Sequence, residues 1–336
     1  MTTLYLTEPG TVVQCRNEAL VIKRQGNRQT LRLVEVGLVV VLPGVQLTSQ
    51  ALAQLMDRGI ETLFLTRGGQ FRGRLQGQFP TNPAIRLAQY RMVETPFGLA
   101  LAQRLVAGKV ANQRALLQRR NRATRGTLGA LSEAIDAIAA YRSTLDHTET
   151  PLSREELMGI EGICARAYFQ GLRHYFDPRW QFQGRNRRPP LDPVNALLSW
   201  GYGVLLARVF AASVQAGLDP YLGFFHAIEP YRPNLVLDLM EEFRPLVVDQ
   251  AVIAILNEGL LSPEDFEPSP DGAGIWVGAV GKKLFLAALE KQLRQTTDYP
   301  PQGRRLSYEQ IILEQARWVA RCLVDRQLDY EPMRLR

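Results

Sequence analysis

One stretch of the sequence, residues 221–250, brings a histidine and several carboxylates close together along the chain. His226 directly follows Phe224 and Phe225, and this aromatic pair predicts an apolar anchor for the imidazole. An imidazole beside carboxylates can act as a base or hold a metal ion. We therefore expect the chemistry of this protein to lie in this stretch.

Three acidic residues follow the histidine on a predicted helix: Asp238, Glu241 and Glu242. With Asn234 as the expected N-cap, their spacing places the carboxylates on neighbouring positions of one side. Two interpretations stay open. The carboxylates line a site for a cation, or they favour the helix N-terminus through its dipole and pair with Arg232 or Arg244 on the surface.

Glu161 is a further carboxylate in an unusual setting. Ser153 and Glu156 form a capping box, which predicts that a helix starts at residue 154. The helix has an apolar stripe: Leu157, Ile160, Cys164 and Tyr168. Glu161 falls in the middle of that stripe, and an ionised carboxylate turned toward a core needs a partner.

An ion pair with Arg166 or Arg244 and a bound metal ion would each satisfy Glu161, and the pattern alone does not choose between them. Gly159 and Gly162 flank the carboxylate and are expected to leave the backbone open to close approach by another element. Placed beside His226 and the acidic helix, Glu161 completes a set of two or three oxygen donors and one imidazole. Such a set favours magnesium or manganese over zinc.

Other sequence signals exclude several function classes. His147 and His174 lack acidic neighbours at a useful spacing and receive no role. The chain contains no Walker A loop, GxGxxG turn or GxSxG elbow, so nucleotide binding and serine-type hydrolysis have no support. Three cysteines, far apart and odd in number, offer neither a disulfide framework nor a CxxC zinc site.

The composition is that of a globular chain. With 336 residues and 46% hydrophobic content, the chain can bury a large core and is long enough for two domains. No apolar run is expected to approach the ~18 residues of a membrane span, and the first residues lack the parts of a signal peptide. We expect a cytoplasmic protein without a membrane partner.

The charge balance is basic, with 40 Lys and Arg against 33 Asp and Glu and a net charge of +7. Arginines cluster in two runs: Arg114, Arg119, Arg120, Arg122 and Arg125, then Arg185, Arg187 and Arg188. Clustered cations gain affinity by releasing counterions from a polyanion, and guanidinium groups suit phosphate. Nucleic acid is therefore the natural partner, with a solvated basic face as the alternative.

The predicted secondary structure changes from strands to helices near residue 78. Before it, strands are predicted at 3–7, 11–16, 19–23, 29–34, 37–42, 60–66 and 70–75, with one helix from residue 49 or 50 to 58. Residues 1–78 are expected to form a small β-rich N-terminal domain. The prolines of residues 79–83 predict a linker.

Residues 84–336 carry helical periodicity and predict a larger all-α catalytic domain, so the fold class is α+β. The expected helices are 84–94, 97–107, 112–122, 127–141, 154–176, 193–216, 235–244, 246–257, 282–295 and 308–327. The arginine-rich residues 183–190 are expected to form an exposed loop.

Four motifs, in this order, resemble the CRISPR-associated integrase family, the larger of the two proteins that insert new spacers into a CRISPR array. The motifs are residues 159–162 with 165–169, residues 187–198, residues 223–226 and residues 238–245. The expected layout also matches, because that family places a β-rich domain before a helical catalytic domain. The resemblance covers nearly the whole chain.

The resemblance implies a metal site formed by Glu161, His226 and Glu241, with Asp238 as a further acidic residue that supports catalysis. Many family members have aspartate as the third ligand, whereas this chain has a glutamate followed by Glu242. The choice of Glu241 over Glu242 therefore rests on the family pattern. Three more residues match motif positions and are expected to hold ligands or phosphate: Asn195, Arg166 and Arg244.

The resemblance further implies a metal-dependent DNA integrase and endonuclease. The 3′-hydroxyl of a donor DNA end attacks a repeat phosphodiester, and a magnesium or manganese ion polarises the phosphate. The implied partners are double-stranded DNA (spacer precursor and repeat), a second copy in a homodimer, and the small second adaptation protein. Two alternatives remain: a stand-alone metal-dependent nuclease, and a non-catalytic DNA-binding subunit whose acidic residues are structural.

Overall fold

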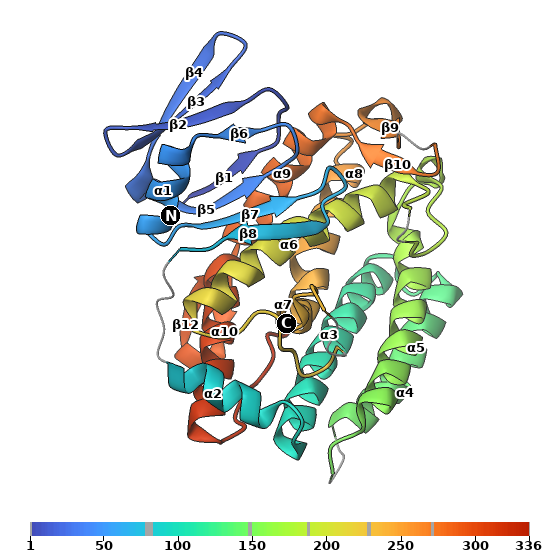
Figure 1. Cartoon of the computed structure of the whole chain (residues 1–336). Coiled ribbons are helices and arrows are strands. Elements are labelled where there is room, and N and C mark those ends of the chain that lie inside the picture. The colour runs from blue at the N-terminus through green and yellow to red at the C-terminus, as the bar shows by residue number, and fades with distance from the viewer. Residues whose placement is uncertain are drawn as a thin grey trace.

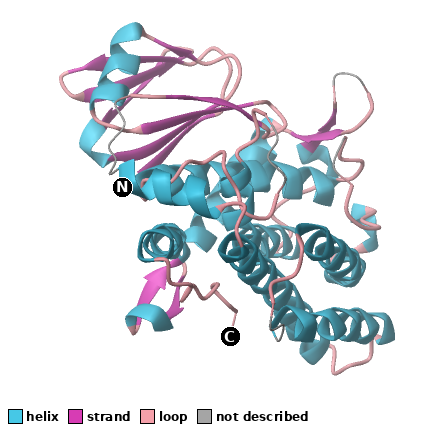
Figure 2. Ribbon diagram, turned by 60° about the horizontal axis from the view of Figure 1, so that its bottom comes forward, coloured by secondary structure: helices cyan, strands magenta, loops and turns pink. Residues whose placement is uncertain are grey.

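The computed structural model describes residues 2–77, 83–146, 150–186, 189–226, 230–269 and 272–335. A β-rich N-terminal part lies at one end of a larger, mainly helical part (Figure 1). Figure 2 shows the same division from another direction, with the long strands gathered above the helices.

Two four-stranded sheets form the N-terminal part. One has the order β1-β5-β7-β8, from Thr2–Leu6, Val36–Val41, Glu61–Leu65 and Phe71–Leu75. The other has the order β4-β3-β2-β6, from Asn27–Arg32, Ala19–Arg24, Val12–Arg16 and Gln46–Leu47. The predicted strands and the helix α1 (Ser49–Asp57) are confirmed. Strand β6 was not predicted, because two residues show no alternation.

Strand β5 joins the two parts of the molecule. It pairs in parallel with β1 and β7. Val39 and Val41 belong to the core of the N-terminal part, whereas Leu38 and Val40 belong to the core of the helical part. A parallel strand buried on both faces reads as a continuous apolar run, as it does here. Helix α6 (Pro193–Gln215) crosses the second face of this sheet (Figure 1).

The helical part supplies the long elements that carry the site. Its helices are α2 (Pro83–Met92), α3 (Pro96–Ala123), α4 (Gly129–Asp146), α5 (Arg154–Leu172), α6, α7 (Asn234–Met240), α8 (Gln250–Asn257), α9 (Ala279–Arg294) and α10 (Tyr308–Asp325). Helices α3, α4 and α5 pack side by side (Figure 1). Of the predicted linker, residues 79–82 lie outside the described residues, and Pro83 already belongs to α2.

Two expectations about this part are wrong. The helices expected at 97–107 and 112–122 are one helix, α3, because residues 108–111 are buried and packing holds them helical despite Gly108. The part is also not all-α, since it holds two hairpins: β9 (Phe266–Pro268) with β10 (Ile275–Val277), and β11 (Thr296–Tyr299) with β12 (Arg304–Ser307). Strands of three or four residues are too short for their alternation to be read.

Helix α6 also corrects the expectation that no apolar run reaches the length of a membrane span. By length and composition it is long and apolar enough to cross a membrane, although 83% of its most apolar window is buried inside the protein. Arg208 interrupts the apolar run and is paired with Glu290 and Glu309. Within the described residues, α6 is therefore the central core helix.

Candidate active site

Glu161 and Glu241 meet at one buried cation, Lys109. Lys109 lies on α3, Glu161 on α5, and Glu241 directly follows α7. The lysine ammonium donates a hydrogen bond to Glu161, and its Nζ lies 2.5 Å from Oε2 of Glu241. Packing of α3 against both α5 and the turn after α7 thus brings together two carboxylates that are far apart along the chain.

The charges at this point reinforce one another. Burial alone would lower the pKa of Lys109, but the carboxylates of Glu241 and Glu161 outweigh it and hold that pKa above its usual value. Burial likewise works to raise the pKa of Glu241, yet Arg244 and Lys109 lower it to about 2. Arg244 Nη2 lies 3.2 Å from Oε1 of Glu241.

Asp238 fixes His226 and the loop in front of it. Its Oδ2 accepts hydrogen bonds from the backbone N–H groups of Phe224 and Phe225, and its Oδ1 accepts one from the backbone of His226. Oδ1 also lies 2.6 Å from Nδ1 of His226. A Cβ at Gly223 would lie 2.6 Å from Oδ2 of Asp238, so the loop requires glycine there. This arrangement leaves Nε2 of His226 as the nitrogen that can act.

The three clustered carboxylates contact three different partners, which corrects the expectation that they lie on neighbouring positions of one side of a helix. Helix α7 ends at Met240, and a 3₁₀ turn (Glu241–Phe243) and a π-helical turn (Arg244–Asp249) follow it. This change of winding separates the side chains, and all three are buried. Asn234 is also not the N-cap, since it is the first helical residue and Pro233 precedes it without a side-chain cap.

Glu242 faces away from Lys109 and toward the C-terminal tail. Its Oε1 accepts a hydrogen bond from the hydroxyl of Tyr330 at 2.8 Å, and Oε2 accepts one from the backbone of Met333 at 2.8 Å. Gln315 on α10 donates a third, at 3.2 Å. Burial raises the pKa of Glu242 to about 8 against the opposing effect of these bonds. The geometry thus separates the roles of Glu241 and Glu242.

A second buried network, of hydrogen bonds around Asp249, supports Arg244, and the sequence did not reveal it. Asp249 accepts hydrogen bonds from the hydroxyls of Tyr168 on α5 and Tyr202 on α6, each at 2.6 Å. Arg244 lies over the ring of Tyr202, 4.6 Å from its centroid. The network joins α5, α6 and the segment after α7, and so supports the guanidinium that contacts Glu241.

The residues expected to hold ligands or phosphate have other partners or stand free of contacts. Asn195 accepts a hydrogen bond from Arg185 at 2.7 Å and donates one to Asp192 at 2.6 Å, so it holds the chain before α6. Arg166 is exposed. Gly159 and Gly162 have open space beside them, and no described element approaches them. Arg187, Arg188 and His147 lie outside the described residues.

Glu161 therefore forms an ion pair, but with Lys109 instead of Arg166 or Arg244. The sequence signal for Lys109 was present: it is the single charged residue in the small and apolar run of residues 105–111. Residues 108–111 of that run lie between the two expected helices, and a lysine in such a gap carries no information about burial. Once the gap is part of α3, the same lysine must point into the protein and needs an acidic partner.

The donor atoms suit a divalent ion, although the ammonium of Lys109 bridges the two carboxylates here. Within the described ranges, no group of three His, Cys, Asp or Glu side chains is close enough to hold a metal ion. Two carboxylates nevertheless reach one cationic centre, and the Nδ1 of His226 is held by the carboxylate of Asp238, as in metal-ligating histidines. Glu161 and Glu241 could together hold a magnesium or manganese ion, and His226 remains the expected third ligand.

Comparison with known protein families gives one match over most of the chain. The sequence model described as "CRISPR associated protein Cas1" matches residues 4–291. The chain is 37% identical over 326 residues to a CRISPR-associated exonuclease Cas4/endonuclease Cas1 fusion of Rhodospirillum rubrum, covering 95% of this chain and 55% of the fusion. The chain thus spans about half the length of that relative.

A second relative matches along its full length. The CRISPR-associated endonuclease Cas1 3 of Thermus thermophilus is 33% identical over 337 residues, which cover 99% of this chain and 97% of the relative. Two solved structures share the fold. A casposase bound to integration product has a TM-score of 0.84 at 21% identity, over 98% of this chain and 93% of the casposase. A Cas6-RT-Cas1–Cas2 complex has 0.85 at 24%, over 100% and 36%.

Proposed function

The chain belongs to the family of the CRISPR-associated protein Cas1, and from this membership we propose that it is a divalent-metal-dependent DNA integrase and endonuclease. Relatives along the full length of the chain are named endonucleases. The casposase of the same fold is described as bound to integration product. Joining a donor 3′-hydroxyl to a phosphodiester and cleaving a phosphodiester with water differ only in the attacking oxygen.

One observation carries the proposal. Glu161 from α5 and Glu241 from the turn after α7 converge on a single cationic centre, and Asp238, three residues before Glu241, holds Nδ1 of His226. A bound magnesium or manganese ion would polarise the phosphate and favour ionisation of the attacking hydroxyl. A carboxylate pair that served only to bind a lysine would not need an oriented imidazole next to it.

The residues of the chain then have distinct tasks. Glu161, Glu241 and His226 would hold the ion, and Asp238 orients the imidazole through its Nδ1. Arg244 keeps Glu241 ionised and in place, since its guanidinium is held over the ring of Tyr202. Lys109 holds the two glutamates together through its ammonium.

The proposed partners follow from the same family. The solved complex of the same fold contains Cas2, so we assign this chain a small second adaptation protein as partner and a second copy of itself as a homodimer. The basic net charge of +7 fits double-stranded DNA, both as spacer precursor and as repeat. We place the protein in the cytoplasm, where such DNA is accessible.

A strand-transfer assay tests the function. Donor DNA ends and a repeat-containing plasmid are incubated with the protein and its partner, with manganese or with a chelator. We expect transfer only with the metal. Glu161→Gln and His226→Ala should each lower the rate of transfer by at least ~100-fold, because the ion lowers the activation barrier by several kcal/mol. Glu156→Gln is the matched control, since Glu156 is an exposed capping residue on the same helix.

The alternatives predict different results in the same assay. A stand-alone nuclease would cleave in the presence of metal but transfer no ends. A non-catalytic DNA-binding subunit is favoured by one observation, the ion pair that already satisfies Glu161. It predicts that Glu161→Ala lowers thermal stability and leaves every activity unchanged. Transfer that continues in the chelator would rule out the metal mechanism.

A further inference from the structure

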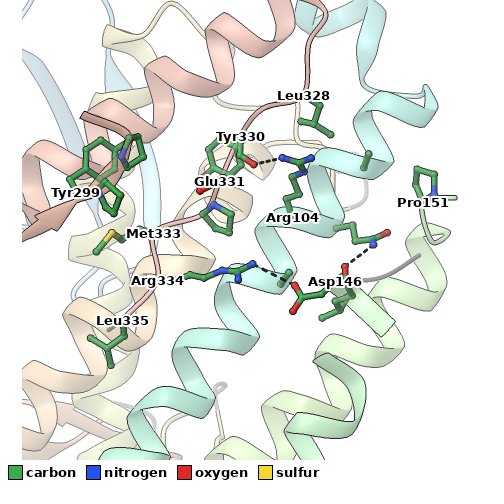
Figure 3. Close-up of a pocket in the computed structure, with 17 residues that line it drawn as sticks. Arg104, Asp146, Pro151, Tyr299, Leu328, Tyr330, Glu331, Met333, Arg334 and Leu335 are labelled. Carbon is green, nitrogen blue, oxygen red and sulfur yellow. Dashed lines mark hydrogen bonds and ion pairs between the residues drawn. The ribbon is translucent and has the colours of Figure 1, made fainter. Parts of the chain in front are cut away.

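The C-terminal tail, residues 328–335, runs beside α3 where that helix carries Arg104 (Figure 3). Arg104 on α3 donates a hydrogen bond to the carbonyl of Tyr330 at 2.7 Å, which fixes the tail backbone on that helix. The side chain of Tyr330 is fully buried and packs beside Trp318 of α10, with 5.7 Å between ring centroids. The tail is thus an integral layer of the helical part.

The tail holds both oxygens of a single carboxylate. The hydroxyl of Tyr330 donates to Oε1 of Glu242, and the backbone N–H of Met333 donates to Oε2, each at 2.8 Å. Glu242 is fully buried and is the residue next to Glu241. The tail is thus hydrogen-bonded to the residue that adjoins Glu241 in the chain.

Asn112 ties the same three segments together at the backbone. Its amide donates to the carbonyl of Glu242 at 2.9 Å and to the carbonyl of Met333 at 2.7 Å. Its Oδ1 accepts from the backbone N–H of Leu335 at 2.7 Å. Asn112 lies three residues beyond Lys109 on α3, so the two side chains occupy neighbouring positions of the helix.

Close packing places the tail directly beside Lys109. A Cβ at Gly108 would lie 2.4 Å from Cβ of Pro332, so only glycine allows the tail to approach α3 this closely. The same Cβ would lie 3.5 Å from Cβ of Glu242. The tail, Glu242 and α3 therefore meet at Gly108, one residue before the lysine that bridges Glu161 and Glu241.

We infer that the tail is a strap that positions Glu241 for the divalent ion, with Tyr330, Met333 and Asn112 as its positioning residues; this inference rests on the proposed function. Glu241 stands in a 3₁₀ turn of three residues, which has few hydrogen bonds of its own. Tyr330 and Met333 hold the two carboxylate oxygens of the neighbouring Glu242, and Asn112 holds its backbone carbonyl. These hydrogen bonds make the turn that carries Glu241 more rigid. Outer partners of this kind govern metal affinity through ligand orientation.

Binding of Mn²⁺ to the full chain without DNA, measured by calorimetry beside thermal unfolding, tests the strap. Tyr330→Phe keeps the ring and removes the hydroxyl, which donates to Glu242 and accepts from Gln315. We expect Mn²⁺ to bind about 10-fold more weakly. Tyr5→Phe is the matched control, because Tyr5 in β1 also donates to a carboxylate, that of Glu290, at 2.8 Å. It should lower stability and leave the affinity for Mn²⁺ unchanged.

Glu241→Gln separates the two levels of the inference. If the wild type binds no Mn²⁺, or if Glu241→Gln binds it equally well, the proposed metal site and the strap both fail. If Glu241→Gln weakens binding and Tyr330→Phe does not, only the strap is overturned. Equal weakening by Tyr5→Phe would also overturn it, because the effect would then be a general loosening.

A second variant reaches the strap without altering a hydrogen-bonding group. In Gly108→Ala the added methyl meets Pro332 and pushes the tail from α3. We expect this variant to bind Mn²⁺ more weakly than the wild type as well, and unchanged binding would contradict the strap. The variant also keeps the inference testable if Tyr330→Phe fails to fold.

Discussion

Lys109 is the residue on which the chemistry of this site depends most directly. Two buried carboxylates with like charge repel each other and need a cation between them. The ammonium of Lys109 provides that cation in the structure, assisted by Arg244 on the Glu241 side. The proposed ion would take over the same electrostatic task, so the lysine and the ion stabilise the same pair.

Replacing Lys109 by methionine tests this exchange. We expect Lys109→Met to lower the free energy of unfolding by about 3–5 kcal/mol, the cost of leaving a buried charge unpaired. Added Mn²⁺ should restore much of the loss, so the metal should raise the unfolding temperature more in the variant than in the wild type. Thermal unfolding with and without Mn²⁺ measures both effects.

Lys282→Met serves as the control, because Lys282 is also buried but forms no ion pair among the described residues. Mn²⁺ should affect it no more than the wild type. A Lys109→Met protein whose stability ignores Mn²⁺ would argue that the two glutamates do not share a metal ion.

At the level of elements, the contact between α6 and the β7–β8 turn fixes how the helical part sits on the sheet. A Cβ at Gly203 of α6 would lie 1.8 Å from the carbonyl oxygen of Gly69 in that turn. Gly69 itself has a φ of +84° and lies against the backbone of Trp200. The helix and the turn thus touch backbone to backbone, and α6 then carries Tyr202 toward Arg244.

Gly203→Ala should therefore lower the free energy of unfolding by about 1–3 kcal/mol. We expect a value near the upper limit, because the added methyl group meets backbone atoms, which cannot move aside as a side chain does. Gly159→Ala on α5 is the matched control. Nothing lies within 4 Å of a Cβ there, and alanine should stabilise the helix by roughly 0.5–1 kcal/mol. Urea denaturation compares the two. Equal stability of Gly203→Ala and wild type would contradict this packing.

Over the whole molecule, the distribution of charge suggests a path for the proposed DNA partner. On helix α3, Lys109 at the site and the exposed Arg122 are separated by roughly 20 Å along the helix axis, at 1.5 Å per residue. Arg125 follows just beyond its end and is also exposed. A DNA backbone that enters the site is thus expected to continue along these cations.

The salt dependence of DNA binding tests this path. We expect the double variant Arg122→Gln and Arg125→Gln to weaken binding to any sequence and to reduce the slope of log K against log salt by up to about 2, since each phosphate contact contributes about 0.9. The control is Arg28→Gln with Arg32→Gln, which removes the same charge from exposed positions of the edge strand β4. An equal change in slope from the control would indicate a diffuse field in place of a path.

The sequence by itself determined what depends on neighbours along the chain. Alternation and turn residues gave the strands of the N-terminal part, and the capping box at Ser153 fixed the start of α5, as the structure confirms. Motif spacing named the family and the candidates Glu161, His226, Asp238 and Glu241. Each of these signals is local, because hydrogen bonds and periodicity within an element repeat over a few residues.

Only the tertiary structure decided which of these side chains meet, and through what. The continuity of α3 turned a lysine in an apparent gap into the partner of Glu161 and Glu241. Asp238 at the end of α7 contacts the loop of His226. After the change of winding at Met240, Glu241 contacts Lys109 and Glu242 contacts the C-terminal tail. These outcomes depend on contacts between segments distant along the chain, where burial makes each charge find a partner that local spacing cannot name.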